Sequence, residues 1–68
     1  MNANKLKGKI VENGLTVSEL ALKIGVDSST MYRKISAKNG DKMLIREVKE
    51  IIEILHLTDE EAVSIFFN

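Results

Sequence analysis

Residues 16–36 read TVSELALKIGVDSSTMYRKIS, and they carry the strongest fold signal in the sequence. Thr16 and Glu19 have the spacing of a capping box, in which the Thr hydroxyl accepts a hydrogen bond from the Glu amide and the Glu carboxylate accepts one from the Thr amide. A helix is therefore expected over Val17–Ile24. Gly25 follows it, and glycine ends helices readily because it tolerates positive φ.

A second short helix is expected directly after a turn at residues 25–27. Asp27 and Ser28 are both favourable N-cap residues, so this helix is predicted over Ser28–Ser36. Two helices that cross closely need a small residue at the contact, and Ala21 provides one. The pattern is typical of a helix-turn-helix. The apolar residues expected to hold the pair against the rest of the chain are Leu20, Ile24, Val26, Met31 and Ile35.

The rest of the chain is also predicted to be helical, and no proline interrupts it. Asn39 and Gly40 form a turn dipeptide in a loop expected over Ala37–Lys42. Thr58 and Glu61 have the spacing of a second capping box. We therefore expect a single all-α domain of five short helices over residues 1–68. The three helices outside the central pair are expected over Ala3–Asn13, over Leu44–Leu55 and from Thr58 onward.

The composition fits a small folded domain and excludes several classes of protein. The chain has 68 residues, of which 44% are hydrophobic and 29% are charged, which is ordinary for a globular domain. It contains no cysteine, which removes disulfides and thiolate metal sites and fits a reducing cytoplasm. No apolar run approaches about 18 residues, so no membrane span is expected, and no signal-peptide pattern follows the lysine-rich start.

Charge is unevenly distributed along the chain, although the formal net charge is zero. Residues 1–42 carry eight Lys or Arg and four Asp or Glu, whereas residues 43–68 carry two and six. The first part therefore has a charge of +4 and the second a charge of −4. Such asymmetry favours a polyanion-binding face on the N-terminal part. Solvated surface charges that happen to be sorted in this way are the alternative.

The run from Leu20 to Ile35 resembles the helix-turn-helix of the Cro and CI phage repressor family. In that family a segment Leu-Ala-x-x-x-Gly-Val is followed by Ser or Asp and then by a recognition helix that begins x-Ser-Thr, and residues 20–30 here read LALKIGVDSST. The resemblance extends over the whole chain and is strongest to small phage-encoded regulators of Gram-positive bacteria. The family often has Ser or Thr at the start of the fourth helix, where this chain has Leu44, so Asp41 is an alternative cap.

This resemblance implies a lambda-repressor-like DNA-binding domain and a function in transcription regulation, as a phage repressor or a Cro-like protein. It implies double-stranded DNA as the partner and the cytoplasm of a bacterial host, on the nucleoid, as the location. The alternative is a protein-interaction module with the same fold that does not bind DNA, such as an antirepressor or a partner of a larger regulator. Net neutrality and the acidic C-terminal half favour that alternative.

The exposed face of the second helix of the motif is predicted to read bases. At about 100° per residue, Arg33 lies opposite Met31 and Ile35. A guanidinium can bond both O6 and N7 of guanine, so Arg33 is the principal candidate, with a solvated or phosphate-bound arginine as the alternative. The residues expected to contact bases are Ser28, Ser29, Tyr32 and Arg33.

The other base candidates each have a structural alternative. Ser28 can cap the helix instead. Tyr32 can contact a phosphate or a thymine methyl group, or it can shield Ile35 as a half-buried ring. Asp27 is interpreted as a cap rather than as a reader of cytosine.

Phosphate contacts are predicted around the same two helices. The start of the first helix of the motif offers free amides and the positive end of the helix dipole, which favour an anion. Lysines in and after the second helix add positive charge, although any single lysine can instead be solvated. The residues expected to contact phosphates are Thr16, Ser18, Lys23, Lys34, Lys38, Asn39 and Lys42.

No enzymatic or metal chemistry is expected. Glu53 and His56 have the Glu-x-x-His spacing of di-iron bundles, but such a site needs further ligands and the chain has one histidine. His56 is better interpreted as a residue at a helix C-terminus. Together with Glu47 and Glu50, Glu53 is expected on an exposed acidic face. No nucleophile–base set or glycine-rich phosphate loop is present, so we expect no enzyme, no cofactor and no small-molecule ligand.

Phe66 and Phe67 are adjacent near the C-terminus, so they cannot both be buried in one small core. Phe66 is in line with Ala62 and is the expected core residue. Phe67 is then exposed, which indicates either a partner surface or a frayed terminus. Specific operator binding by so small a domain usually requires a dimer, so a homodimer through the C-terminal helix and Phe67 is predicted.

Overall fold

Five α-helices follow one another along the chain in the computed structural model, which describes residues 1–36 and 43–67. No strand occurs within these two ranges, and the prediction of an all-helical chain with five short helices is confirmed. None of the described helices is long and apolar enough to cross a membrane. The helices are α1 (Ala3–Glu12), α2 (Val17–Ile24), α3 (Ser28–Lys34), α4 (Ile45–Ile54) and α5 (Asp59–Phe66).

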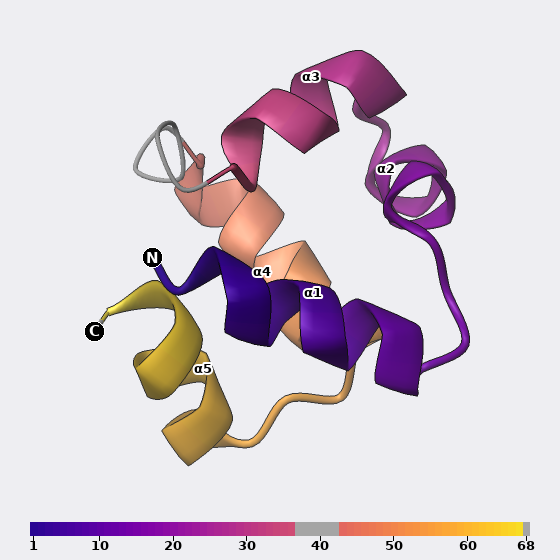
Figure 1. Ribbon diagram of the computed structural model, residues 1–68. Helices are drawn as coiled ribbons and strands as arrows, with labels where there is room; N and C mark the ends of the chain where they lie inside the picture. The colour runs from indigo at the N-terminus through magenta and orange to yellow at the C-terminus, as the bar shows by residue number, and fades with distance from the viewer. Residues whose placement is uncertain (37–42, 68) are drawn as a thin grey trace.

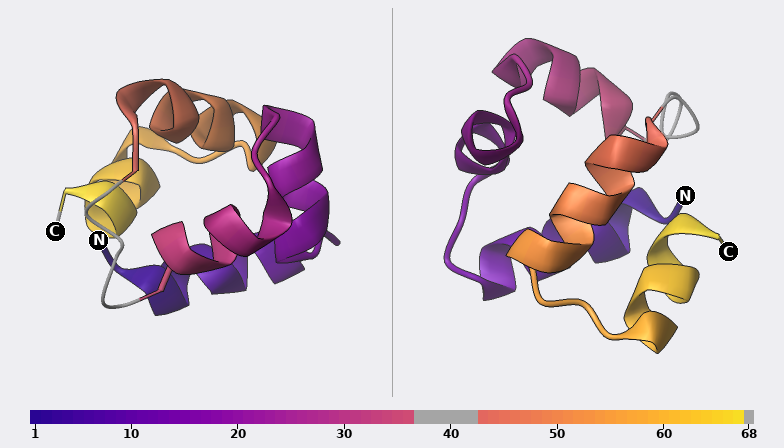
Figure 2. Two further views of the ribbon diagram at one scale, coloured as in Figure 1. Left: turned by 90° about the horizontal axis from the view of Figure 1, so that it is seen from above. Right: turned by 180° about the vertical axis from the view of Figure 1, so that it is seen from behind.

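The helices surround a shared apolar core. Figure 2 shows α1 and α4 on opposite sides of the molecule, with α2 at one end, α5 at the other and α3 across the top. The start of the chain lies beside the end of α5, where the Asn2 amide donates to the Ile65 carbonyl at 2.7 Å. Every helix contributes to the core, whose buried members include Leu6, Ile10, Leu20, Ile24, Met31, Ile35, Ile51, Leu55 and Ile65.

The caps predicted from the sequence form at α2 and α5. Both the Thr16–Glu19 and the Thr58–Glu61 capping boxes are complete. Gly25 ends α2 in the left-handed conformation with φ of 71°, as expected for a glycine at this position. The predicted helix bounds lie within two residues of the observed ones, and the largest difference is at α3, which ends at Lys34 rather than at Ser36.

Asp27, not Ser28, caps α3. The Asp27 carboxylate accepts hydrogen bonds from the amides of Ser29 and Thr30 at 3.1 and 3.4 Å. Ser28 is the first residue of the helix and is exposed. The turn is closed by the Val26 amide, which donates to the Ala21 carbonyl at 2.9 Å. These bonds fix the position of α3 relative to the end of α2.

The start of α4 differs from the expectation. Leu44 occupies the N-cap position, where its side chain cannot accept a hydrogen bond, and the Glu47 carboxylate accepts from the Leu44 amide at 2.9 Å. The alternative cap, Asp41, lies outside the described residues. Glu47 was expected on the exposed acidic face with Glu50 and Glu53, and this prediction is wrong, because Glu47 is only 2% exposed. Its burial is possible because it is paired, as described below.

α4 ends in a strained conformation at His56. The C-cap residue is Leu55, and His56 follows it with φ of 52°, which is the one positive φ outside glycine in the described part of the chain. This geometry lets the Leu57 amide donate back to the Ile52 carbonyl at 3.0 Å. In a side-chain-bearing residue, positive φ crowds Cβ against the backbone.

We expect His56→Gly to raise the free energy of unfolding by about 0.5–1 kcal/mol, because glycine relieves the steric cost of positive φ. The greater freedom of glycine in the unfolded chain limits the gain. Gly25→Ala is the matched reverse change: a Cβ there meets nothing within 4 Å, so only the backbone penalty at φ of 71° applies. We expect that variant to lose about 1 kcal/mol. Urea unfolding followed by circular dichroism measures both, and a loss of stability in His56→Gly contradicts the interpretation.

Candidate nucleic-acid interface

α3 lies on the outside of the molecule (Figure 1), and its exposed residues are polar. Its apolar anchors, Met31 and Ile35, are fully buried. Arg33 is exposed on the opposite side of the helix, as predicted from the helical period. Tyr32 is 52% exposed, so its side chain is partly open to solvent and partly covered by the protein. The face therefore combines a guanidinium, a phenol and, at its N-terminal end, the exposed Ser28 and Ser29.

Hydrogen bonds within α3 hold this face in a defined arrangement. The Ser29 hydroxyl donates to the Asp27 carboxylate in addition to the two amides that the carboxylate caps. Arg33 Nη2 donates to the Thr30 hydroxyl at 3.2 Å. A guanidinium has five N–H donors, so this bond leaves most of them for a ligand. The Asp27 carboxylate caps α3, which agrees with the prediction that this residue is a helix cap rather than a reader of cytosine.

The predicted phosphate-binding residues fall into three groups. Ser18 and Lys23 are exposed on α2, and the Thr16 hydroxyl and amide are both used in the capping box. Lys34 is different, because its Nζ lies 2.8 Å from each carboxylate oxygen of Glu47 and its side chain is largely buried. The remaining candidates lie outside the described residues, and they are Lys38, Asn39 and Lys42.

Several lysines of the basic N-terminal half form ion pairs or hydrogen bonds with residues of the acidic C-terminal half. Lys9 Nζ pairs with Glu61 of α5 and lies 3.2 Å from Glu12. Lys5 Nζ donates to the Ser64 hydroxyl, also on α5. The charge asymmetry of the sequence is therefore partly neutralised where α1 meets α5. On α2 and α3, by contrast, Lys23 and Arg33 have no carboxylate within 4 Å in the described structure, although Glu19 and Asp27 are also exposed there.

The burial of Glu47 is the feature that the sequence interpretation missed. Glu47 precedes Ile51 by four residues and Leu55 by eight, so it belongs to the buried stripe of α4. This spacing was a usable signal. It was outweighed by the neighbouring Glu50 and Glu53, whose presence indicated a solvated acidic face. A buried carboxylate has to be paired with a cation, and Lys34 of α3 is the cation that pairs with Glu47.

Three carboxyl groups have depressed pKa values in the folded protein. The pKa of Asp27 is lowered by hydrogen bonds from Ser29 and Thr30, and the pKa of Glu61 is lowered by Lys9 and the Thr58 amide. Burial tends to raise the pKa of Glu47, but the hydrogen bonds from Lys34 and the Leu44 amide lower it below the ordinary value. A depressed pKa means that the unfolded chain binds protons more readily than the folded one.

We therefore expect stability to be constant just above about pH 5 and to fall as the pH drops below the unfolded carboxyl pKa of about 4 toward the lower folded values. The contribution of these groups is present above the unfolded pKa and is lost as pH falls through the folded pKa. Thermal melts across this range measure the effect. In Glu61→Gln the decline should be shallower than in the unmodified protein. Equal stability at about pH 5 and about pH 3 is the contrary result.

Comparisons of the chain with known protein families, with characterised proteins and with solved structures find no match.

Proposed function

We propose that the protein is a sequence-specific DNA-binding transcription regulator of the Cro/CI phage repressor kind. In this proposal α2 and α3 form the helix-turn-helix of a lambda-repressor-like domain, and α3 enters the major groove of double-stranded DNA. The observation that carries the proposal is the exposed Arg33 on the face of α3 opposite the buried Met31 and Ile35. A helix needs this arrangement to reach base edges while it stays anchored to its domain.

Arg33 is the proposed base reader, through O6 and N7 of guanine. Ser28 and Ser29 lie at the N-terminal end of α3, which in helix-turn-helix proteins contacts base edges, and Tyr32 is placed to contact a thymine methyl group or a phosphate. Lys23 and Ser18 on α2 are proposed phosphate contacts. The proposed location of such a regulator is the cytoplasm of a bacterial host. The further phosphate contacts proposed are Thr16, Lys38, Asn39 and Lys42.

The test is a binding titration against a pool of random duplexes at about 50 and about 200 mM salt, followed by selection of the bound sequences. We expect measurable binding at low salt, a steep loss at high salt because phosphate-bound counterions are released, and enrichment of one short motif. Binding without enrichment contradicts sequence specificity. No binding at low salt contradicts the proposal as a whole.

The alternative is a protein-interaction module that has the same fold and does not bind DNA. This alternative is supported by ion pairs within the protein that neutralise two of its lysines, because Lys9 pairs with Glu61 and Lys34 pairs with Glu47. The same titration separates the two functions, because this alternative predicts no binding at low salt. We favour the regulator because Arg33, on the exposed face of α3, forms no ion pair within the described residues.

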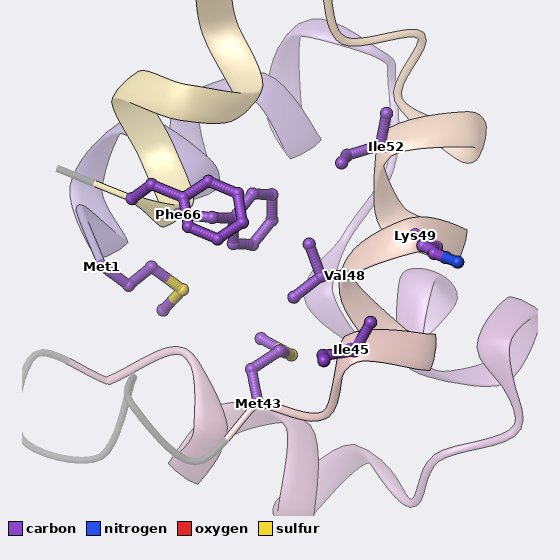
Figure 3. A pocket seen from close by; sticks show the side chains of 8 residues that line it. Met1, Met43, Ile45, Val48, Lys49, Ile52 and Phe66 are labelled. Carbon is purple, nitrogen blue, oxygen red and sulfur yellow. The ribbon is translucent and has the colours of Figure 1, made fainter. Parts of the chain in front are cut away.

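The dimer expected of such a regulator has a candidate interface where α4 and α5 meet. An apolar pocket of about 450 Å³ lies there, and Phe67 beside it is 72% exposed, as predicted. Figure 3 shows Met1, Met43, Val48 and Phe66 around this pocket. Its other lining residues are Ile45, Lys49, Ile52 and Phe67.

A second copy of the chain is the proposed occupant of this face. The pocket includes side chains from the first turn of α4, which is also the part of α4 that α3 contacts through Lys34 and Glu47. In the proposed dimer, a two-fold axis through this face has to place the two α3 helices about 34 Å apart, which is the spacing of paired half-sites. Lys49 has the one charged side chain among the residues that line the pocket, so self-association brings few charged side chains together.

We expect the protein to sediment as a dimer on operator DNA and Phe67→Ser to shift it toward the monomer, with weaker operator binding, because the substitution removes apolar surface from the interface. Val63→Ser is the matched control, since Val63 is an exposed apolar residue of α5 that does not line this pocket. It should leave the association unchanged. A monomeric state both free and on operator DNA contradicts the dimer.

A further inference from the structure

Lys34 and Glu47 form an ion pair that joins the end of α3 to the beginning of α4. Lys34 Nζ lies 2.8 Å from both carboxylate oxygens, and the Leu44 amide donates to Oε1 of the same carboxylate at 2.9 Å. The Glu47 side chain is 2% exposed and that of Lys34 is 19% exposed. The two residues are 13 positions apart in the sequence, so their pair is a tertiary link between two helices.

The position of Lys34 around α3 gives this link a specific effect. The hydrogen bonds at Asp27 and Val26 hold the N-terminal end of α3, and the anchors Met31 and Ile35 lie on one side of the helix. Neither set of contacts opposes a roll at the C-terminal end of α3 as directly as a contact from the flank of the helix does. At about 100° per residue, Lys34 lies about 100° from Ile35 in one direction and about 100° from Arg33 in the other. A link at Lys34 acts from the side of the helix and resists the roll.

The consequence of a small roll is large for base recognition. A rotation of α3 by about 20° moves a group about 6 Å from the helix axis by about 2 Å. Hydrogen bonds to a base edge tolerate only a few tenths of an ångström before they weaken. The direction of Arg33 is therefore sensitive to whatever fixes the roll of α3.

We infer that Glu47, acting through Lys34, sets the roll of α3 and thereby directs Arg33 toward the base edges. Glu47 is in this sense a positioning residue for sequence recognition, and the inference rests on the proposed function. Lys34 accordingly acts inside the protein and is not a phosphate contact. The ionised state of the carboxylate fits this role, because its hydrogen bonds hold the pKa of Glu47 below the ordinary value despite burial.

Glu47→Gln tests the inference because its two expected effects have opposite signs. The variant keeps a side-chain oxygen for the Leu44 amide but releases Lys34 and adds one positive charge. We expect its affinity for random duplex to rise about twofold or more at low salt. Its affinity for the operator selected by the unmodified protein should fall, so that the ratio of operator to random affinity drops about tenfold or more.

The ratio separates positioning from a loss of structure. Partial unfolding lowers both affinities by the same factor and leaves the ratio unchanged. Glu50→Gln is the matched control, since it makes the same change of charge on the same helix, where Glu50 pairs with Arg46 at 2.8 Å. It should raise both affinities together and leave the ratio within about twofold of its original value.

A second variant covers the case in which Glu47→Gln does not fold. Lys34→Gln combined with Glu47→Gln removes the ion pair without a change in net charge and without an unpaired buried charge. We expect unchanged affinity for random duplex and an operator-to-random ratio about tenfold lower. Fluorescence anisotropy with both duplexes, on samples shown by circular dichroism to be folded, gives these ratios.

The inference is overturned if folded Glu47→Gln, or the folded double variant, keeps the original operator-to-random ratio. It is also overturned if the double variant is unfolded, because the pair is then a requirement for folding and not a device for orientation. Failure of the unmodified protein to bind any duplex is a separate result. It removes the proposed function, and the positioning role with it, before any variant is compared.

Discussion

Leu20→Ala is expected to lower the free energy of unfolding by about 2–5 kcal/mol, because it removes a fully buried side chain from a close-packed core. Leu20 is 0% exposed and belongs to the cluster that all five helices share. A domain of this size has a total stability of about 3–10 kcal/mol, so the loss is a large part of it. Urea unfolding followed by circular dichroism measures the difference, and the midpoint should fall without a large change in slope.

Leu22→Ala is the matched control, two residues further along the same helix. Leu22 is 82% exposed, so its truncation removes little buried surface. Alanine also has the higher helix propensity, and we expect a change within about 0.5 kcal/mol of zero. The two substitutions are chemically identical and differ only in the face of α2 on which they fall. Similar losses in both variants contradict the orientation of α2 described above.

The central pair of helices could be predicted from the sequence because its signals are local. The Thr16–Glu19 box, the glycine at Gly25 and the cap at Asp27 each act within three or four residues of their own position. The buried and exposed faces of α3 followed from the helical period alone, which placed Met31 inside and Arg33 outside. Such features depend little on how the rest of the chain is arranged.

The ion pairs between different helices could not be predicted in this way, because they depend on how the helices pack. Lys9 and Glu61 are brought together only when α1 and α5 lie side by side. The pairing of Glu47 with Lys34 could not be predicted either, although the position of Glu47 four residues before Ile51 indicated that Glu47 is buried. The positive φ of His56 also could not be predicted, because a histidine in the sequence does not indicate a left-handed conformation as a glycine does.

Those tertiary features change the interpretation of the candidate interface. The sequence assigned Lys34 to a phosphate, whereas its ammonium group is bound to Glu47. Net charge by segment therefore overstates the positive charge available to DNA. The exposed cations on α2 and α3, Lys23 and Arg33, remain. In the proposed DNA-binding function, specificity then depends on few groups, so the loss of any one of them has a larger effect.

Arg33→Ala is accordingly expected to lower the affinity for operator DNA by about 1–3 kcal/mol, which is about 5- to 150-fold, and to relax the preference for one base. The loss on random duplex should be smaller, because only one phosphate-attracting charge is removed there. Arg33 is exposed and the hydrogen bond of its guanidinium, to Thr30, is local, so stability should change little. Titrations on operator and random duplexes give the two losses separately.

Arg46→Ala is the control for charge, since Arg46 is an exposed arginine of α4 that pairs with Glu50. It removes the same charge, and we expect small and equal losses on both duplexes. The contact itself is tested by replacing each operator guanine with 7-deazaguanine, which removes the N7 acceptor. At one position this change should weaken the unmodified protein and leave Arg33→Ala unaffected, because the bond that it removes is already absent there. Equal sensitivity of both proteins at every guanine contradicts base reading by Arg33.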